Sequence, residues 1–254
     1  KMKSIDEFIS RIYRSTQHVT IEHFRNWALK ELQELIHFDA AIWSTGHLST
    51  RTFHTHTTLN LPKHFSDLLL ENLAINPISK ELFNKVGQAV DMADVINDQD
   101  FFQSKIYHSV FQPHHIERIL SSVDIEPRSG IYTLLSIYRH NKDSPFTASE
   151  KLAYQRALFH LKEASSHACI LSLKSDISNN LEHHAICDRY GVYHEVEPLF
   201  LDLIDDAFPE NTSQTLPFSL PEPGIKVMIR DMLVIVVQLG DLYRVSIRQA
   251  NPLD

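Results

Sequence analysis

The sequence predicts an α+β protein in which two antiparallel-sheet domains are joined by one long helix. Apolar residues recur at helical spacing from residue 147 to about residue 181, strand-like runs lie on both sides of this segment, and turn residues separate those runs. At about 1.5 Å per residue such a helix would exceed about 45 Å, which is too long for one small domain to cover. We therefore expect a first domain over 1–146, a connecting helix over 147–181 and a second domain over 182–254.

Length and composition agree with a two-domain globular protein. A chain of 254 residues is near the practical limit of a single core, and 43% hydrophobic with 22% charged residues is ordinary globular material. No apolar run approaches the ~20 residues that span a bilayer, so no membrane partner is expected. The two cysteines, Cys169 and Cys187, suit a reducing cytoplasm. The net charge of −8 argues against DNA binding by this part of the protein, because phosphate contacts require a basic face.

The first domain is expected to begin with helices and to continue with strands that short helices interrupt. Apolar and polar residues alternate from 131 to 138, as is typical of a strand. Asn76-Pro77 is expected to end the helix over 65–75. The expected elements are, in order, helices over 4–36, a strand over 38–45, a second strand through Thr58, a helix over 65–75, short helices and loops over 77–112, and the strand over 131–138.

The long helix has a recognisable beginning. Thr147 can cap its amino terminus, and Glu150, three residues on, can reach back to the backbone of Thr147. Two shorter helices broken near Ser165 and Ser166 are the alternative to one continuous helix.

The second domain is expected to contain a small sheet and one helix. An Asp-x-x-Gly turn at Asp188 and Gly191 separates its first two strands, and Gly240-Asp241 forms a turn between its last two. The expected elements are strands over 185–188 and 191–195, a helix over 197–207, a Pro-rich loop over 209–223, and a three-stranded meander over 225–229, 233–239 and 242–248.

Several segments resemble the sensory region of a LuxR-type helix-turn-helix transcriptional regulator, with a GAF-like first domain and a PAS-like second domain. These segments are Asn76-Pro77, 100–107, 134–139, 144–150 and 158–164. The resemblance implies a ligand-binding region in a bacterial cytoplasm that controls a DNA-binding domain absent from this chain, so DNA would be bound only through that missing C-terminal domain. A dimerisation or protein-interaction module that binds no small molecule is the alternative function.

One branch of that family can be compared residue by residue. Acyl-homoserine-lactone receptors carry Trp-x-x-x-Tyr followed by Asp-Pro, whereas this chain has Phe65-x-x-x-Leu69 and then Asn76-Pro77. Loss of the carboxylate removes a charge-assisted hydrogen bond of about 1.5–3 kcal/mol, and loss of the tyrosine removes another polar anchor. The sequence therefore disfavours a lactone ligand.

Aromatic residues are frequent between the expected strands and short helices of the first domain. Small-molecule sites are mostly apolar, so these side chains predict a pocket for an apolar or aromatic ligand. The candidate ligand-binding residues are Trp43, Phe53, Phe83, Phe102, Tyr107, Phe111 and Tyr132. We expect one cavity that is touched by at least Trp43, Phe102 and Tyr107. The alternative is that each of them only fills the core.

Metal and enzyme signatures are weak in this sequence. His54 and His56 would share one strand face, and His183 with Cys187 could chelate only within a helix. The chain has no Cys-x-x-Cys, His-Glu-x-x-His, Gly-x-Ser-x-Gly or Gly-x-x-x-x-Gly-Lys motif, and it has only six glycines. We expect no metal site, no other cofactor and no enzymatic activity.

The long helix also carries a possible dimer seam. Ala157, Ala164 and Leu171 repeat every seven residues, with Leu161 and Ala168 beside them. This spacing predicts a homodimer that pairs through the helix. The alternative is that the same face packs on the sheets of its own chain.

Overall fold

The computed structural model describes residues 4–16, 18–50, 52–174, 181–251 and 253–254. By its internal contacts the chain divides into two compact units. The first unit comprises Lys1–Gly46, Arg51–Ile125 and Tyr132–Ala168, and the second comprises His47–Thr50, Glu126–Ile131 and Cys169–Asp254. The first unit therefore extends past residue 146 and takes in most of the long helix. Residues 175–180 of the expected connector lie outside the described residues.

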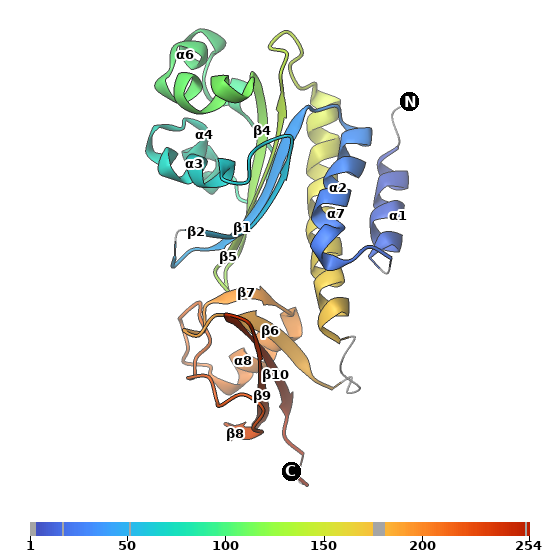
Figure 1. Ribbon diagram of the computed structural model, residues 1–254, viewed down its shortest axis with the longest axis vertical. Helices are drawn as coiled ribbons and strands as arrows, with labels where there is room; N and C mark the ends of the chain where they lie inside the picture. The colour runs from blue at the N-terminus through green and yellow to red at the C-terminus, as the bar shows by residue number, and fades with distance from the viewer. Residues whose placement is uncertain (1–3, 17, 51, 175–180, 252) are drawn as a thin grey trace. The chain divides into compact units, whose positions relative to one another are not determined.

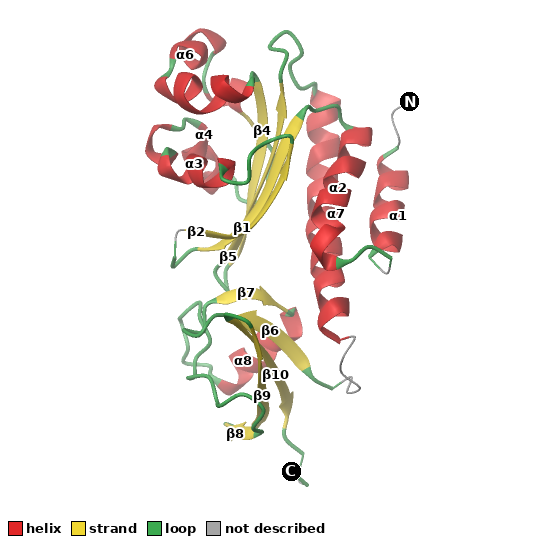
Figure 2. Ribbon diagram, in the orientation of Figure 1, coloured by secondary structure: helices red, strands yellow, loops and turns green. Residues whose placement is uncertain are grey.

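The first sheet has five strands, in the spatial order β2-β1-β5-β4-β3 (Figures 1 and 2). Its strands are β1 (Ala40–His47), β2 (Thr52–Leu59), β3 (Val90–Asp91), β4 (Arg118–Glu126) and β5 (Ile131–Arg139). The short edge strand β3 runs antiparallel to β4, with Val90 opposite Ser121. The two expected strands before residue 60 and the strand over 131–138 are confirmed, whereas β3 and β4 were not foreseen from the sequence.

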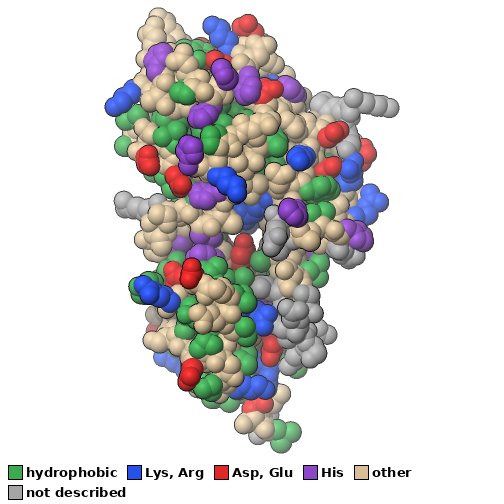
Figure 3. Space-filling model, in the orientation of Figure 1, with side chains coloured by type: hydrophobic (Ala, Val, Ile, Leu, Met, Phe, Trp, Pro, Cys, Tyr) green, Lys and Arg blue, Asp and Glu red, His purple; other side chains and the backbone are tan. Residues whose placement is uncertain are grey.

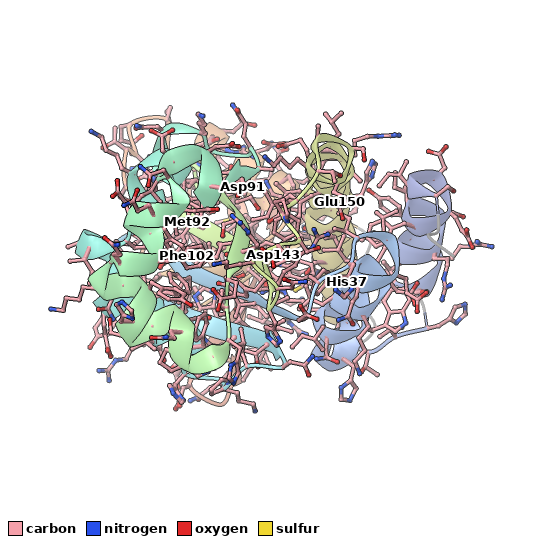
Figure 4. The ribbon with its side chains drawn as sticks, turned by 90° about the horizontal axis from the view of Figure 1, so that it is seen from above. His37, Asp91, Met92, Phe102, Asp143 and Glu150 are labelled. Carbon is pink, nitrogen blue, oxygen red and sulfur yellow. The ribbon has the colours of Figure 1, made fainter. Side chains whose placement is uncertain are left out.

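Helices cover both faces of this sheet. One face carries α1 (Ile5–Ser15), α2 (Ile21–Leu35) and α7 (Ala148–Lys174), and the other carries α3 (Phe65–Glu71), η1 (Leu73–Ile75), α4 (Ile78–Asn84), α5 (Met92–Val95), α6 (Asp98–Gln103), η2 (Tyr107–Phe111) and η3 (Gln112–His114) (Figure 1). The expected helix over 65–75 is thus two shorter pieces. Figure 4, seen from above, shows Phe102 on the side of the sheet away from His37 and Glu150.

The sheet separates two hydrophobic cores because successive strand residues point to opposite faces. In β1, Ala41 and Trp43 belong to the core beneath α1, α2 and α7, while Ala40 and Ile42 belong to the core beneath the shorter helices. Every residue of β1 is consequently buried.

The capping box expected at the start of α7 is confirmed. The backbone N–H of Glu150 donates to Thr147 Oγ1 over 3.2 Å, and the backbone N–H of Thr147 donates to Glu150 Oε1 over 2.9 Å. The helix continues without a break through Ser165 and Ser166 as far as Lys174, so the alternative of two shorter helices is wrong.

The expected dimer seam on α7 is wrong, because the helix uses it to cover its own sheet. Ala157 and Ala164 are fully buried, Leu161 and Ala168 are 1% and 3% exposed, and all four lie in the core shared with α1 and α2. Leu171 alone of the expected seam is exposed. An amphipathic helix must bury its apolar stripe, and here the nearest apolar partner is the sheet of the same chain.

A buried ion pair joins the first sheet to the beginning of α7. Arg139, at the end of β5, pairs with Glu150, and the two side chains are only 4% and 16% exposed. The guanidinium also donates to the backbone carbonyl of His37 over 2.9 Å and lies 4.2 Å over the ring of Phe146. Burial opposes ionisation of Glu150, but its hydrogen bonds with Arg139 and Thr147 outweigh burial, so the pKa of this carboxyl lies below its usual value.

This lowered pKa predicts how the pair responds to acid. A carboxyl whose pKa is lowered by folding stabilises the fold above its unfolded pKa of about 4.3, and the contribution is lost as the pH falls through the folded pKa. We expect Glu150→Gln to be less stable than the unchanged protein at pH 7, with the difference narrowing below about pH 4. Urea unfolding of both proteins at pH 7 and pH 3.5 measures this difference in the free energy of unfolding. An equal difference at both pH values would show that ionised Glu150 does not stabilise the fold.

The second unit contains another five-stranded antiparallel sheet, in the order β7-β6-β10-β9-β8. Its elements are β6 (His183–Cys187), β7 (Tyr193–Val196), α8 (Pro198–Ala207), β8 (Val227–Ile229), β9 (Met232–Leu239) and β10 (Leu242–Gln249). Numbered along its own unit, each of the two sheets has the strand order 2-1-5-4-3. The expected two strands, helix and three-stranded meander are confirmed, and so is the α+β class.

Tight turns set the register of the meander. Arg230 and Asp231 have φ values of 42° and 58°, as the two central residues of a type I′ hairpin require. Leu242 pairs with Leu239 across the turn at Gly240. Alternate residues of β9, namely Met232, Val234 and Val236, then pack in the core with α8.

Candidate ligand-binding site

The first unit contains a cavity between its sheet and the shorter helices. Alternate residues of β4 and β5 form the floor, because residues two apart on a strand share a face. They are Ile119, Ser121 and Val123 from β4 and Tyr132, Leu134, Ser136 and Tyr138 from β5. The side facing the floor comes mostly from α3, η1 and α4.

The helical side of the cavity is almost entirely apolar. It consists of Leu69, Leu70, Leu73, Asn76, Ile78, Ser79, Leu82 and Phe83, and Phe53 of β2 and Phe111 of η2 complete the lining. Phe83 and Leu73 are 43% and 42% exposed, so they stand at the mouth of the cavity. The cavity volume is about 50 Å³. At about 10–15 Å³ for each water, this is room for a few water molecules.

Among the described residues that line the cavity, none carries a charge. The hydroxyls of Ser121 and Ser136 hydrogen-bond to each other over 2.5 Å. Burial raises the pKa of Tyr132 to about 12, and burial also raises the pKa of Tyr138 against a smaller lowering by its hydrogen bond with Ser136. Both phenols are therefore neutral at physiological pH. The site offers hydroxyl groups and one amide, Asn76, within an apolar surface.

Four of the seven candidate residues meet at this cavity: Phe53, Phe83, Phe111 and Tyr132. The other three do not line it, so the expectation of one cavity touched by Trp43, Phe102 and Tyr107 is wrong. Whether the four that meet there bind a ligand stays a prediction.

Trp43 lies on the other face of the sheet. It is 2% exposed, it belongs to the core beneath α2 and α7, and the guanidinium of Arg25 from α2 lies 4.9 Å from its ring centre. Its position in β1 decides this, since Trp43 shares a strand face with Ala41, whereas Ile42 faces the shorter helices.

Phe102 and Tyr107 lie on the correct face but away from the cavity. Their rings contact each other at 5.0 Å, the Tyr107 hydroxyl donates to the carboxylate of Glu117 at 2.8 Å, and the amino group of Lys142 lies 5.5 Å from the Phe102 ring. Neither ring is among the residues that line the cavity.

Sequence reasoning missed most of the helical side of the cavity and all of its floor except Tyr132. Ser121 and Ser136 are too small to suggest a pocket, and Ile119 and Val123 belong to the unforeseen strand β4. Tyr138 could have been identified as a lining residue from the sequence. It is six residues from Tyr132 in the predicted strand, so both side chains lie on the same face of the sheet.

The histidines do not assemble a metal centre in the part of the chain that the structure describes, where no group of three or more His, Cys, Asp or Glu side chains could hold an ion. Figure 3 shows several histidine side chains at the surface. His56 lies 3.7 Å from Asp67, and His183, which is in a strand and not a helix, lies 3.2 Å from Glu197.

No described helix is both long and apolar enough to cross a bilayer.

Comparison with known proteins gives likeness in structure alone. No family model matches the chain, and no curated protein matches it in sequence. Among solved structures, SdiA of Escherichia coli is similar with 17% identity and a TM-score of 0.49, over 70% of this chain and 72% of SdiA.

Two further structures represent the two classes that the sequence resembles. CepR2 of Burkholderia cenocepacia, an N-acylhomoserine-lactone-dependent LuxR-family transcription factor, has 14% identity and a TM-score of 0.46, over 67% of this chain and 99% of CepR2. The phycoerythrobilin-bound GAF domain of a cyanobacterial phytochrome has 15% identity and a TM-score of 0.45, over 69% of this chain and 100% of that domain. Likenesses of this degree carry no argument about function.

Proposed function

We propose that this chain is the ligand-binding, sensory region of a cytoplasmic LuxR-type transcriptional regulator, and that the cavity of the first unit is its ligand site. The chain acts without catalysis and as a homodimer, and DNA binding belongs to a domain outside it. One observation carries the proposal: an apolar cavity between a sheet and short helices, with no charge among its described lining residues. A mainly apolar lining with a few polar groups is the usual lining of small-molecule sites.

The lining selects an uncharged, mainly apolar ligand. A charged group in this cavity would lose its hydration without meeting a counter-charge, which is costly. An alkyl chain would instead lie against leucine and phenylalanine side chains, and a hydroxyl or carbonyl group could hydrogen-bond to Ser121 or Ser136. A lactone belongs to this neutral class, but Asn76 supplies an amide where a carboxylate would bind it more strongly, so a lactone stays disfavoured.

The small size of the cavity suggests how ligand binding would change the conformation of the first unit. A ligand larger than a few atoms must move the helical side outward, since the volume is only about 50 Å³. The segment best suited to move is η1, which has no buried residue, together with the exposed Phe83 on α4. A ligand that prefers the displaced arrangement shifts the population of the first unit toward it. The same small volume also favours the second candidate, an interaction module that binds no small molecule.

Matched neutral and charged probes separate these two functions. We expect 1-octanol to stabilise the protein against urea, by about 2.7 kcal/mol at one hundred times its Kd, and we expect octanoate at equal concentration to stabilise it far less. The two probes share an eight-carbon chain and differ in charge. Equal effects would contradict a neutral-selective cavity, and no effect from any neutral amphiphile of this size would favour the interaction module.

A further inference from the structure

The outer face of α7 carries two large apolar side chains that the core does not use. Leu152 is 67% exposed and Phe159 is 60% exposed, although Tyr154, Ala157 and Leu161 on the opposite face are buried. Leu152 and Phe159 are seven residues apart, so they lie two helical turns and about 10.5 Å from each other along one line. Single exposed apolar residues are ordinary, so Leu152 and Phe159 indicate a docking surface only together with the charged residues beside them.

The same line also carries two opposite charges. At 100° per residue, Leu152, Arg156, Phe159 and Glu163 fall within an arc of about 60°. Arg156 and Glu163 both reach the surface, and the one ion pair of Arg156 given by the described residues is a long contact of 3.5 Å with Asp6. We call these four residues the outer ridge of α7.

Neighbouring residues of α7 define the two sides of the outer ridge. On one side, the imidazole of His160 hydrogen-bonds to the hydroxyl of Tyr13 on α1 over 3.1 Å. On the other side, Lys162 pairs with Asp124 of β4. Since the residues on both sides are turned toward their own unit, the outer ridge is the part of the helix that remains available.

We propose that a second copy of this chain packs on the outer ridge with its own α7 antiparallel. The midpoint between Arg156 and Glu163 falls beside Phe159, so a two-fold axis there brings each arginine to the partner's glutamate. The two Phe159 rings then meet at the centre, in the self-complementary contact that two-fold symmetry requires. This inference rests on the homodimer included in the proposed function, and it adds the interface and its direction.

Charge selects this direction over the parallel one. In a parallel pair, Arg156 would face Arg156 and Glu163 would face Glu163, and like charges across an interface are unfavourable. In the antiparallel pair both contacts are attractive. The second copy is therefore a better occupant of the outer ridge than an unrelated apolar surface, because its charges match at both ends.

Sedimentation equilibrium on residues 1–254 tests the interface. We expect a dimer whose Kd rises at least about tenfold with Phe159→Ser, and we expect no change with Leu199→Ser, which removes a similarly exposed apolar side chain from α8. A wild-type chain that stays monomeric at high concentration would overturn the homodimer itself. A dimer that Phe159→Ser leaves unchanged would overturn only the outer ridge as its interface.

Charge reversal tests the direction. Arg156→Glu and Glu163→Arg should each weaken self-association about tenfold, whereas an equimolar mixture of the two variants should associate as well as the wild type. In the mixed antiparallel dimer one chain carries glutamate at both positions and the other carries arginine at both, so the two contacts are attractive again. A parallel dimer would show no weakening with the single variants, because each merely replaces one like-charge contact with another. That result would overturn the antiparallel arrangement.

Discussion

Replacing Arg139 with alanine is expected to destabilise the first unit by about 3–5 kcal/mol. The substitution leaves Glu150, whose side chain is only 16% exposed, without its buried counter-charge. It also removes hydrogen bonds from the guanidinium to the backbone carbonyls of Ser144 and Pro145, at 3.2 and 3.0 Å. These carbonyls belong to the segment between β5 and α7. The substitution therefore removes contacts that join the first sheet to this helix.

Urea unfolding measures this loss, and Lys85→Ala is the matched control. Lys85 also pairs with a glutamate, Glu81, but on the surface of α4, where its side chain is 52% exposed. Exposed pairs of this kind contribute about 0.5 kcal/mol or less. A loss of under about 1 kcal/mol for Arg139→Ala would show that the pair at the start of α7 is not an important stabilising contact.

Placing a phenylalanine at Ser79 is expected to weaken binding of 1-octanol at least about 100-fold, which corresponds to about 2.7 kcal/mol. Ser79 lines the cavity from α4 and is 9% exposed, so the larger ring would occupy the space that the ligand needs.

Lys80→Phe is the control for this substitution. Lys80 is the next residue of α4 and is exposed, so the same ring would point into solvent. Isothermal titration calorimetry with 1-octanol should give an unchanged Kd for Lys80→Phe. Equal weakening by both substitutions would indicate a general effect on α4, and no weakening by Ser79→Phe would place the ligand elsewhere.

Local patterns predicted the elements whose signals are strong. The capping box at Thr147 and Glu150, the hairpin turn at Gly240 and the alternation over 131–138 each depend on a few neighbouring residues, and each is found in the structure. Strand β4 was missed because Ser121 and Ser122 interrupt its apolar pattern. Those serines are buried only because Ser136 and Tyr154 supply their hydrogen bonds, and both partners are distant in sequence.

The site was harder to predict than the fold, because a cavity depends on which face of a strand each residue occupies. Trp43 and Tyr132 lie on opposite faces of the sheet. The alternation of side chains along each strand shows this only once the two strands have been placed in one sheet. The seam on α7 failed for a similar reason. A seven-residue repeat shows that a face is apolar, and it does not show whether the partner is another chain or the sheet of the same chain.

The most direct test of the central claim locates a bound neutral ligand. We would record intermolecular nuclear Overhauser effects between ¹³C-labelled 1-octanol and the aromatic protons of the protein. The proposed site predicts contacts with Phe53 and Tyr132, which line the cavity of the first unit. Contacts with Trp43, on the opposite face of the sheet, or with Tyr243 of the second unit would contradict it.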